Sequence, residues 1–330
     1  MAATTFNPKT AVFTPAETST RGVERIKAME ANKHRAMPLP IEKIGEYFAP
    51  LMPGDICAIV AQSSNYKTGI MKMWETFLAG YLKENGRDEV IIRVDAENSV
   101  EGLAIQDIAM LSNHTVADLS RGNVRDWKQV IEAASSISDI AVYRIATSLG
   151  SDMATDLYLS NIYRAINYMV KGELTGQPLK PACIFIDYLQ ALPIDTEVAT
   201  AEIANQRRLQ VRQDVYRIRQ MSTHLDCPIV VGVQAKQSLG GHTGSNMLVP
   251  GMYDGEESSS IAQRFDRVIG LWMPKTTHTV GDSLTHKGTI NFEVTEDLIW
   301  IKVNKQRGGL PAGRSWQCKI DYDTNTIKPI

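Results

Sequence analysis

Apolar runs and helix-length segments alternate along the chain from Pro53 onwards. Between the early runs lie segments of helical length, at Thr68–Glu84, Trp127–Ser136, Thr155–Lys171 and Glu202–Leu225. The runs themselves are short, β-branched and almost continuously apolar, which is typical of strands buried on both faces. They lie at Asp55–Ala61, Glu89–Asp95, Ala141–Ala146, Ala182–Asp187, Pro228–Val233, Arg267–Met273, Leu298–Asn304 and Ser315–Ile320. This βαβ order predicts an α/β fold with a mostly parallel twisted sheet flanked by helices. The close spacing of the last strands predicts an antiparallel extension at one edge.

The pattern before residue 41 is different. Residues 1–20 are rich in Thr, Pro and Ala without periodicity, which predicts a flexible arm. Arg21–Arg35 is compatible with a helix, but its apolar stripe is too thin to anchor it in a core of its own. The stripe consists of Val23, Ile26 and Met29. We therefore expect 21–40 to form a helix that docks on another surface, and 41–330 to form the α/β domain.

Composition and charge narrow the class of protein. The 330 residues are 43% hydrophobic and 22% charged, with a formal net charge of −2, as in an ordinary soluble globular protein. No apolar run approaches the roughly 20 residues that span a bilayer, and the N-terminus does not resemble a secretory signal. The four cysteines have no CxxC spacing, which favours reduced structural thiols in a cytoplasmic protein. No histidine has a partner at metal-ligand spacing, so the only metal indicated is Mg²⁺ bound with a nucleotide.

A candidate phosphate loop follows the first strand and reads Ala61-Gln62-Ser63-Ser64-Asn65-Tyr66-Lys67-Thr68. The backbone from Ser63 to Tyr66 would cradle phosphates, Lys67 would reach the β and γ oxygens of ATP, and the Thr68 hydroxyl would bind Mg²⁺. The pattern GxxxxGK[ST] fails at Ala61 and Tyr66, so an ordinary first helical turn with a solvated lysine is the alternative. The glycine replaced by Tyr66 usually has a positive φ, which costs another residue about 1–2 kcal/mol.

Two acidic residues end later strands. Asp187 follows the apolar run Ile184-Phe185-Ile186, where a carboxylate would hold the water shell of Mg²⁺, although an Asp that only begins a turn is common. Glu97 follows the second strand and would activate the attacking water, although a surface carboxylate is the commoner outcome. Near the C-terminus, Lys305 and Arg307 form a basic pair. They would stabilise phosphate charge in a neighbouring subunit, or belong to a basic hairpin turn.

Taken in order, these features resemble the C-terminal ATPase domain of DnaB-type hexameric helicases over roughly residues 21–327. The matching positions are Pro53-Gly54-Asp55, Ala61, Glu97, Asp126-Trp127, Asp187-Tyr188-Leu189-Gln190, Ser258-Ser259-Ser260-Ile261-Ala262-Gln263, Lys305-Gln306-Arg307 with Gly309, and the linker helix at Arg21–Arg35. The resemblance implies a RecA-like fold and a homo-oligomer, expected to be a hexamer, that moves on single-stranded DNA with ATP and Mg²⁺. Lys67, Thr68, Asp187 and Glu97 would act from one subunit, with Lys305 and Arg307 supplied by the next.

The resemblance also suggests further candidates. Gln234, or alternatively Gln237, would sense the γ-phosphate. The DNA loops would be Leu192–Ala201 and the Gly-rich Leu239–Ser259. Candidate DNA contacts are Lys236, Gly240, Gly241, His242 and Glu257. The arginines of the helix Glu202–Leu225 are expected on a solvated or subunit-interface face.

The family's large N-terminal primase-interacting domain has no room here, because only about 20 residues precede the linker helix. A primase or loader partner is therefore not indicated. Two other functions remain open. A RecA/RadA-like recombinase or KaiC-like ATPase would share the fold, and a nucleotide-poor scaffold for DNA or protein partners would be consistent with Tyr66.

Overall fold

The computed structural model describes residues 12–148, 157–195, 207–236, 249–251, 254–255, 264–286, 290–308, 311–322 and 324–330. The chain forms two compact units, Met1–Ala36 and Met37–Ile330. The boundary lies close to the one expected at residues 40 and 41.

The first unit contains the helix α1 (Pro15–Ala31), which begins earlier than the sequence pattern predicts. Thr14 caps it, because the Thr14 Oγ1 accepts a hydrogen bond from the Glu17 amide at 3.2 Å and the Glu17 carboxylate bonds the Thr14 amide at 2.7 Å. This reciprocal pair is a capping box, and its Thr-x-x-Glu signature was visible in the sequence. The expectation of an arm over 1–20 is therefore wrong for residues 15–20. As expected, the helix has a thin apolar face, and none of its residues is buried.

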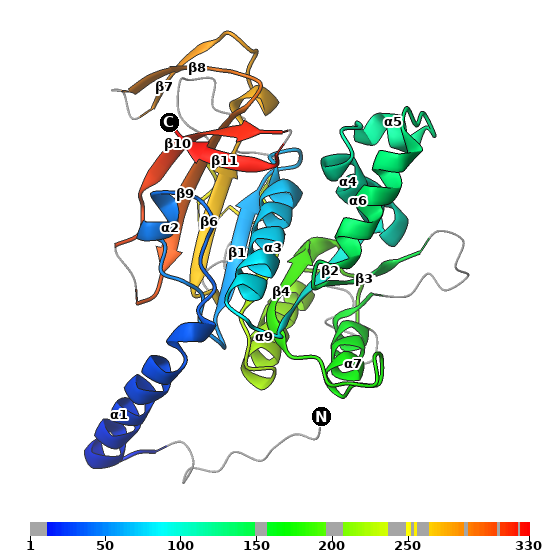
Figure 1. Ribbon diagram of the computed structural model, residues 1–330. Helices are drawn as coiled ribbons and strands as arrows, with labels where there is room; N and C mark the ends of the chain where they lie inside the picture. Colours follow the sequence, from blue (N-terminus) through cyan, green and yellow to red (C-terminus); the bar gives the residue numbers. More distant parts are fainter. Residues whose placement is uncertain are drawn as a thin grey trace. The chain divides into compact units, whose positions relative to one another are not determined.

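The second unit is built on a mixed sheet that has nine strands among the described residues, in the order β11-β10-β9-β6-β1-β5-β4-β2-β3. The six strands from β6 to β3 are parallel, and β9, β10 and β11 continue the sheet antiparallel at one edge (Figure 1). The parallel strands are β1 (Ile56–Ala61), β2 (Val90–Ser99), β3 (Val142–Thr147), β4 (Pro181–Asp187), β5 (Ile229–Gln234) and β6 (Arg267–Trp272). The antiparallel strands are β9 (Leu298–Gln306), β10 (Ser315–Asp321) and β11 (Thr326–Pro329). The predicted fold class is confirmed.

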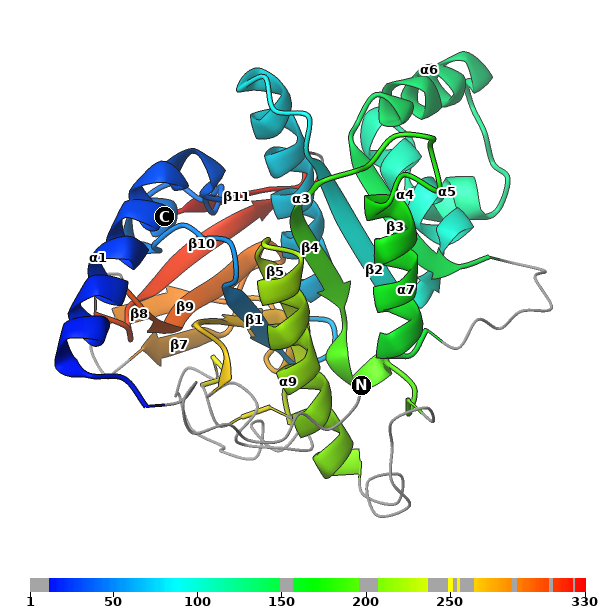
Figure 2. The same ribbon diagram turned by 90° about the horizontal axis from the view of Figure 1, so that it is seen from below.

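Helices cover both faces of this sheet (Figure 2). The helix α3 (Lys67–Glu84) packs on one face through a core that includes Trp74 and Phe185, whose ring centroids are 6.0 Å apart. On the other face, α7 (Leu159–Val170) and α9 (Arg207–His224) share a second core with the alternate positions of the same strands. None of the described helices is long and apolar enough to cross a bilayer. The four cysteines are all buried thiols.

The sequence pattern locates all of the long strands and the helices α3, α6 (Trp127–Ser138), α7 and α9, with small differences at their ends. It misses α4 (Val100–Leu111) because its apolar residues form no clear stripe, and α5 (Val116–Ser120) because it is short. The other missed elements have four residues each, too few for a periodic pattern. They are α2 (Ile44–Tyr47), β7 (Ser283–His286), β8 (Ile290–Glu293) and β11.

Candidate nucleotide site

The loop between β1 and α3 has the expected strand–turn–helix setting. β1 ends at Ala61, and α3 begins at Lys67. The first amides of a helix have no partner within the helix and carry its positive dipole end, so this turn is suited to binding an anion. Ser63 and Ser64 are exposed and line a pocket of about 510 Å³ beside it. The remaining lining residues are Gln62, Tyr66, Lys67, Thr68, Gly69, Glu97, Tyr188 and Gln234.

Asn65, a predicted nucleotide-binding residue, has its side chain turned into the protein. It is 1% exposed. Its Oδ1 accepts a hydrogen bond from the Met273 amide at 2.6 Å, and its Nδ2 donates to the Ser63 carbonyl at 2.9 Å. Met273 directly follows β6, the neighbour of β1. The Asn65 side chain therefore fastens the loop to the sheet.

Tyr66 adopts the positive φ that is usual for the glycine at its position. Its φ is 61° and its ψ is 22°, in the left-handed region. Its ring lies over the first turn of α3, where a Cβ on Gly69 would be 2.5 Å from it. The hydroxyl donates to Oδ1 of Asn325, and the ring meets the edge of Tyr322 with 5.9 Å between centroids. Burial raises the pKa of the Tyr66 hydroxyl. The hairpin of β10 and β11 thus holds the ring and offsets the strain of the backbone.

Lys67 and Thr68 point to residues from two other strands. Lys67 Nζ lies 3.3 Å from Oε1 of Gln234 and 3.8 Å from the ring centroid of Tyr188. Burial lowers the pKa of the Lys67 ammonium, and the Asp187 carboxylate opposes that shift. The Thr68 hydroxyl donates to Oδ2 of Asp187 at 2.6 Å. The ends of β4 and β5 therefore meet the start of α3, as the sequence predicts.

The Asp187 carboxylate is suited to a metal ion. The residue is 1% exposed, and its Oδ1 is buried without a hydrogen-bond partner among the described residues. A buried carboxylate oxygen left unsatisfied is costly, so it indicates a missing partner such as an ion or water. The Thr68 hydroxyl and Asp187 are the oxygen ligands that Mg²⁺ prefers, directly or through its water shell. These two residues fit the predicted ion.

Glu97 lines the pocket because Asp95 shapes the end of β2. Asp95 is fully buried, and its Oδ1 accepts hydrogen bonds from the amides of Glu97 at 3.1 Å and Asn98 at 2.8 Å. Gln234 is held in a similar way by Gln190. The Gln234 amide donates to the Gln190 side chain at 3.0 Å, and the Gln190 side chain donates back to the Gln234 carbonyl at 3.2 Å. Both predicted residues are thus fixed at the mouth of the pocket.

Arg93 is the site residue that sequence reasoning missed. It lies in the middle of β2, is 1% exposed, and its Nη2 donates to Asp187 Oδ2 at 2.7 Å. Burial alone would lower the pKa of the guanidinium, but the carboxylates of Glu75, Asp187 and Asp95 outweigh it and raise the pKa. A single charge inside an otherwise apolar strand was the signal in the sequence, because such a charge is rarely buried without partners.

Comparisons with known proteins agree with this geometry. A family model described as the DnaB-like helicase C-terminal domain matches residues 37–326. The chain belongs to this family. A solved DnaB-like replicative helicase, described with its interactions with primase, is 14% identical with a TM-score of 0.66. That likeness covers 89% of this chain, which spans only 63% of that helicase.

A solved ATPase domain is 13% identical with a TM-score of 0.69, over 97% of this chain and 99% of that domain. These likenesses show the fold, which is RecA-like. No curated protein matches the chain in sequence.

In this DnaB-like domain, Lys305 and Arg307 lie far from the pocket of their own chain. Gln306 is level with Arg267, and Arg267 is level with Cys57 at the start of β1. The phosphate loop follows the other end of β1, roughly 15 Å away at about 3.3 Å per residue. Arg307 is exposed, and its Nη1 contacts Asp266 Oδ1 at 3.0 Å. Burial and the neighbouring Arg307 lower the pKa of Lys305.

Most of the candidate DNA contacts, Gly240, Gly241, His242 and Glu257, fall outside the described residues, as does most of both loops. Lys236 is described and half-buried. Its amide donates to the Asp254 carbonyl at 2.8 Å, and Ala235 forms a bridge with Gly255. Residues 235–236, just before the second loop, therefore meet residues 254–255 beside β5.

The expectation that the α9 arginines form a solvated or subunit-interface face holds for Arg212, which is exposed, but not for Arg207 and Arg219, which are partly buried. Arg207 donates to the carbonyls of Gln190 at 2.6 Å and Leu192 at 2.9 Å, next to the start of the first candidate DNA loop. Arg219 donates to the Gly54 carbonyl at 3.2 Å. These side chains hold neighbouring segments of the same chain, because their multiple donors satisfy carbonyls that follow or precede buried strands.

Two substitutions at Tyr66 distinguish the contribution of its ring from that of its backbone conformation. We expect Tyr66→Phe, which loses only the bond to Asn325, to cost about 1 kcal/mol of stability. Tyr66→Gly relieves about 1 kcal/mol of backbone strain but loses more in aromatic packing, so its Tm should fall. Its affinity for a fluorescent ATP analogue should nevertheless equal or exceed that of the wild type, because the ring points to Asn325 and Tyr322. Loss of nucleotide binding in Tyr66→Gly alone would contradict this interpretation.

Proposed function

We propose that the protein is an ATP-dependent helicase that forms a ring and moves along single-stranded DNA. One observation carries the proposal. Lys67 and Thr68 of α3, Glu97 of β2 and Gln234 of β5 line one pocket at the carboxyl ends of parallel strands, and Asp187 at the end of β4 contacts Thr68 beside it. This is where α/β sheets bind ligands. The scaffold alternative is less favoured, because the Tyr66 ring is held by the hairpin of β10 and β11.

Each residue has a role that its surroundings support. Lys67 would bind the β and γ oxygens, and the backbone from Ser63 to Tyr66 would bind the other phosphate oxygens. Mg²⁺, held by Thr68 and Asp187, would neutralise charge that develops on the phosphates. Glu97 would accept a proton from the attacking water. Gln234 is braced by Gln190 and contacts Lys67, so it is the favoured sensor of the γ-phosphate.

A ring explains two features that a single chain leaves without a role. Lys305 and Arg307 lie near the amino ends of the parallel strands, whereas the pocket of their own chain lies at the carboxyl ends. They would therefore complete the site of a neighbouring subunit. The helix α1 buries none of its residues, and an apolar stripe on a helix gains stability only when another surface covers it. We propose that α1 docks on an adjacent subunit in a hexamer. The end of the expected docking segment 21–40 does not, because Met37 and Leu39 lie in the core of the second unit.

Movement on DNA would come from the loops that follow β4 and β5. Both are anchored next to pocket residues, since Arg207 holds the carbonyls of Gln190 and Leu192, and Lys236 accepts a hydrogen bond from Gln62 at 2.9 Å. Lys236, Gly240, Gly241, His242 and Glu257 are the proposed contacts. Weak contacts from several subunits would add through multivalency. We expect the protein to work in the cytoplasm, with a primase or loader as a possible but not indicated partner.

Unwinding of a forked DNA duplex tests the proposal directly. We expect Lys67→Ala to lose ATP binding and unwinding. We expect Glu97→Gln to keep ATP binding but to hydrolyse ATP at least about 100-fold more slowly, as for loss of a general base. Lys83→Ala and Glu84→Gln, on the exposed end of α3, are the matched controls and should resemble the wild type. Unwinding that continued unchanged in both pocket variants would refute the assignment.

Mixed rings test whether Arg307 acts on a neighbouring subunit. Lys67→Ala and Arg307→Ala should each be inactive alone, but an equal mixture should regain about a quarter of the wild-type hydrolysis rate, since one interface in four has both intact residues in a closed ring. A mixture of Lys67→Ala with Glu97→Gln is the control. It should regain nothing, because both residues belong to the same side of an interface. No recovery in the first mixture would argue against action between subunits.

A further inference from the structure

A buried guanidinium connects three carboxylates next to the candidate site. Arg93 Nη2 lies 2.7 Å from Asp187 Oδ2 and 3.2 Å from Asp95 Oδ2, and Nη1 lies 3.4 Å from Glu75 Oε2. None of these four side chains is more than 1% exposed. The group therefore sits in the interior between α3 and the sheet.

Fold stability does not explain this group. Arg93 is level with Phe185 on β4, on the face that packs against Trp74 and the rest of an apolar core. Burying charges is expensive, and well-packed apolar side chains usually stabilise such a position as well or better. The neighbouring position Ile91 on the same face is apolar. A charge retained here calls for a role beyond packing.

The contacts of Arg93 point to such a role, because two of its partners control residues of the pocket. Asp187 uses Oδ2 for Arg93 and Thr68, which leaves Oδ1 for another partner. Asp95 uses Oδ2 for Arg93 and Oδ1 for the amides of Glu97 and Asn98. A single guanidinium thus contacts both the carboxylate suited to Mg²⁺ and the residue that accepts a hydrogen bond from the Glu97 amide.

We propose that Arg93 is a positioning residue for ATP hydrolysis. It fixes the Asp187 carboxylate so that Oδ1 is available to the ion, and through Asp95 it links this carboxylate to the last part of β2, which carries Glu97. A planar group with several donors in a fixed fork can hold two carboxylates at once, which a lysine ammonium does with less geometric control. The inference rests on the proposed function, since it assigns Arg93 to the same site.

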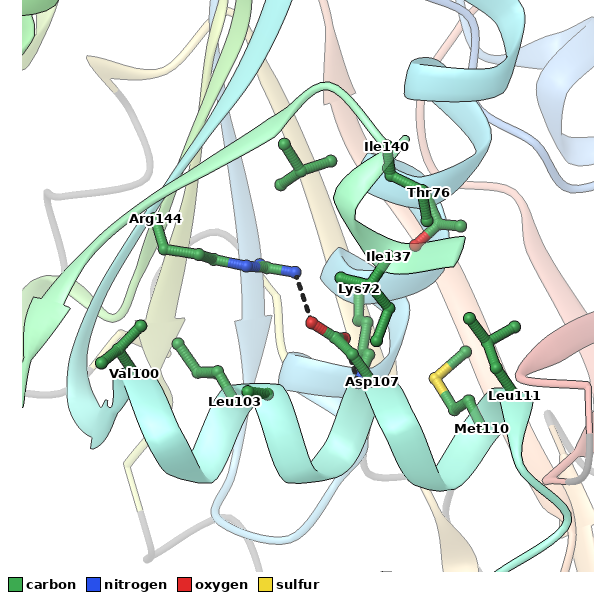
Figure 3. Close-up of a pocket in the computed structure, with 12 residues that line it drawn as sticks. Lys72, Thr76, Val100, Leu103, Asp107, Met110, Leu111, Ile137, Ile140 and Arg144 are labelled. Carbon is green, nitrogen blue, oxygen red and sulfur yellow. Dashed lines mark hydrogen bonds and ion pairs between the residues drawn. The ribbon is translucent and has the colours of Figure 1, made fainter. Parts of the chain in front are cut away.

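A second layer of ion pairs holds Arg93 from behind. Glu75 on α3 also accepts from Arg144 on β3 at 2.6 Å, and Arg144 reaches Asp107 on α4 at 3.1 Å (Figure 3). Asp107 in turn contacts Lys72 of α3 at 2.7 Å. Lys72, Asp107 and Arg144 line a mainly apolar pocket of about 160 Å³ between α3, α4, α6 and β3. The network restrains Glu75 and, through it, the orientation of Arg93.

The test uses the full chain with Arg93→Lys and Arg93→Met. Arg87→Lys is the matched control. Arg87 pairs with Glu89 at 2.7 Å just before β2, and this end of β2 is far from the end that lies beside Asp187 of β4. The affinity of a fluorescent ATP analogue is measured with and without Mg²⁺, together with kcat, KM and Tm. For Arg93→Lys we expect the Mg²⁺-free affinity to stay within about twofold, while the gain in affinity from Mg²⁺ and kcat each fall about tenfold or more, as when a residue supporting a metal ligand is lost. Arg87→Lys should leave these quantities unchanged.

A double variant shows whether the effect passes through Asp187. In the Asp187→Asn background, Arg93→Lys should no longer change the gain in affinity from Mg²⁺, since coupled residues give non-additive effects. A lower Tm with unchanged Mg²⁺ gain and kcat in Arg93→Lys would overturn the inference and leave Arg93 a purely structural role. If Arg93→Met does not fold, the Arg93→Lys result alone decides whether Arg93 is a positioning residue. A wild-type protein that neither binds nor hydrolyses ATP would overturn the proposed function, and the inference with it.

Discussion

The parallel register of β1, β5, β4 and β2 is the constraint on which the candidate site depends. Ala61 is level with Gln234, and Asp95 is level with Asp187, so the carboxyl ends of these strands meet at one edge. The residues that follow them are separated by long stretches of sequence, yet they contact one another within hydrogen-bond distance. Because helices cover both faces of the sheet, these contacts form at the border of a dry interior, where each polar group needs a partner.

Because buried polar groups need partners, ion pairs form beside the pocket. Asp187, Asp95 and Glu75 are buried carboxylates on one side of the sheet, and Arg93 and Arg144 balance their charge. Such a group gives little net stability but a defined geometry, since moving any one member leaves another unpaired. The loop at residues 62–66 is restrained by different means, through Asn65 to Met273 and through Tyr66 to Asn325. A phosphate loop without its usual glycines is thus held by contacts to distant parts of the chain.

The sequence predicts those parts of the site that depend on local pattern. Strands ending in Asp187 and near Glu97 and a helix beginning at Lys67 follow from residue types and their order. The rest depends on tertiary contacts. The residues near Tyr66 in the sequence do not show that its hydroxyl bonds Asn325, which is 259 residues away. Arg93 interrupts an apolar strand pattern, but the pattern does not show that its carboxylate partners include Asp187 on another strand. The Thr-x-x-Glu box at Thr14, by contrast, is a local signal for the start of α1.

A crystal structure with a non-hydrolysable ATP analogue and Mn²⁺ would test the account most directly. We expect the phosphates at the backbone of residues 63–68 and an anomalous peak for the metal beside the Thr68 hydroxyl and Asp187, with Arg93 still bonded to Asp187 Oδ2. Thr68 and Asp187 supply the hard oxygen ligands that such an ion prefers. Nucleotide bound elsewhere, or a metal ion that displaces Arg93 from Asp187, would contradict the account.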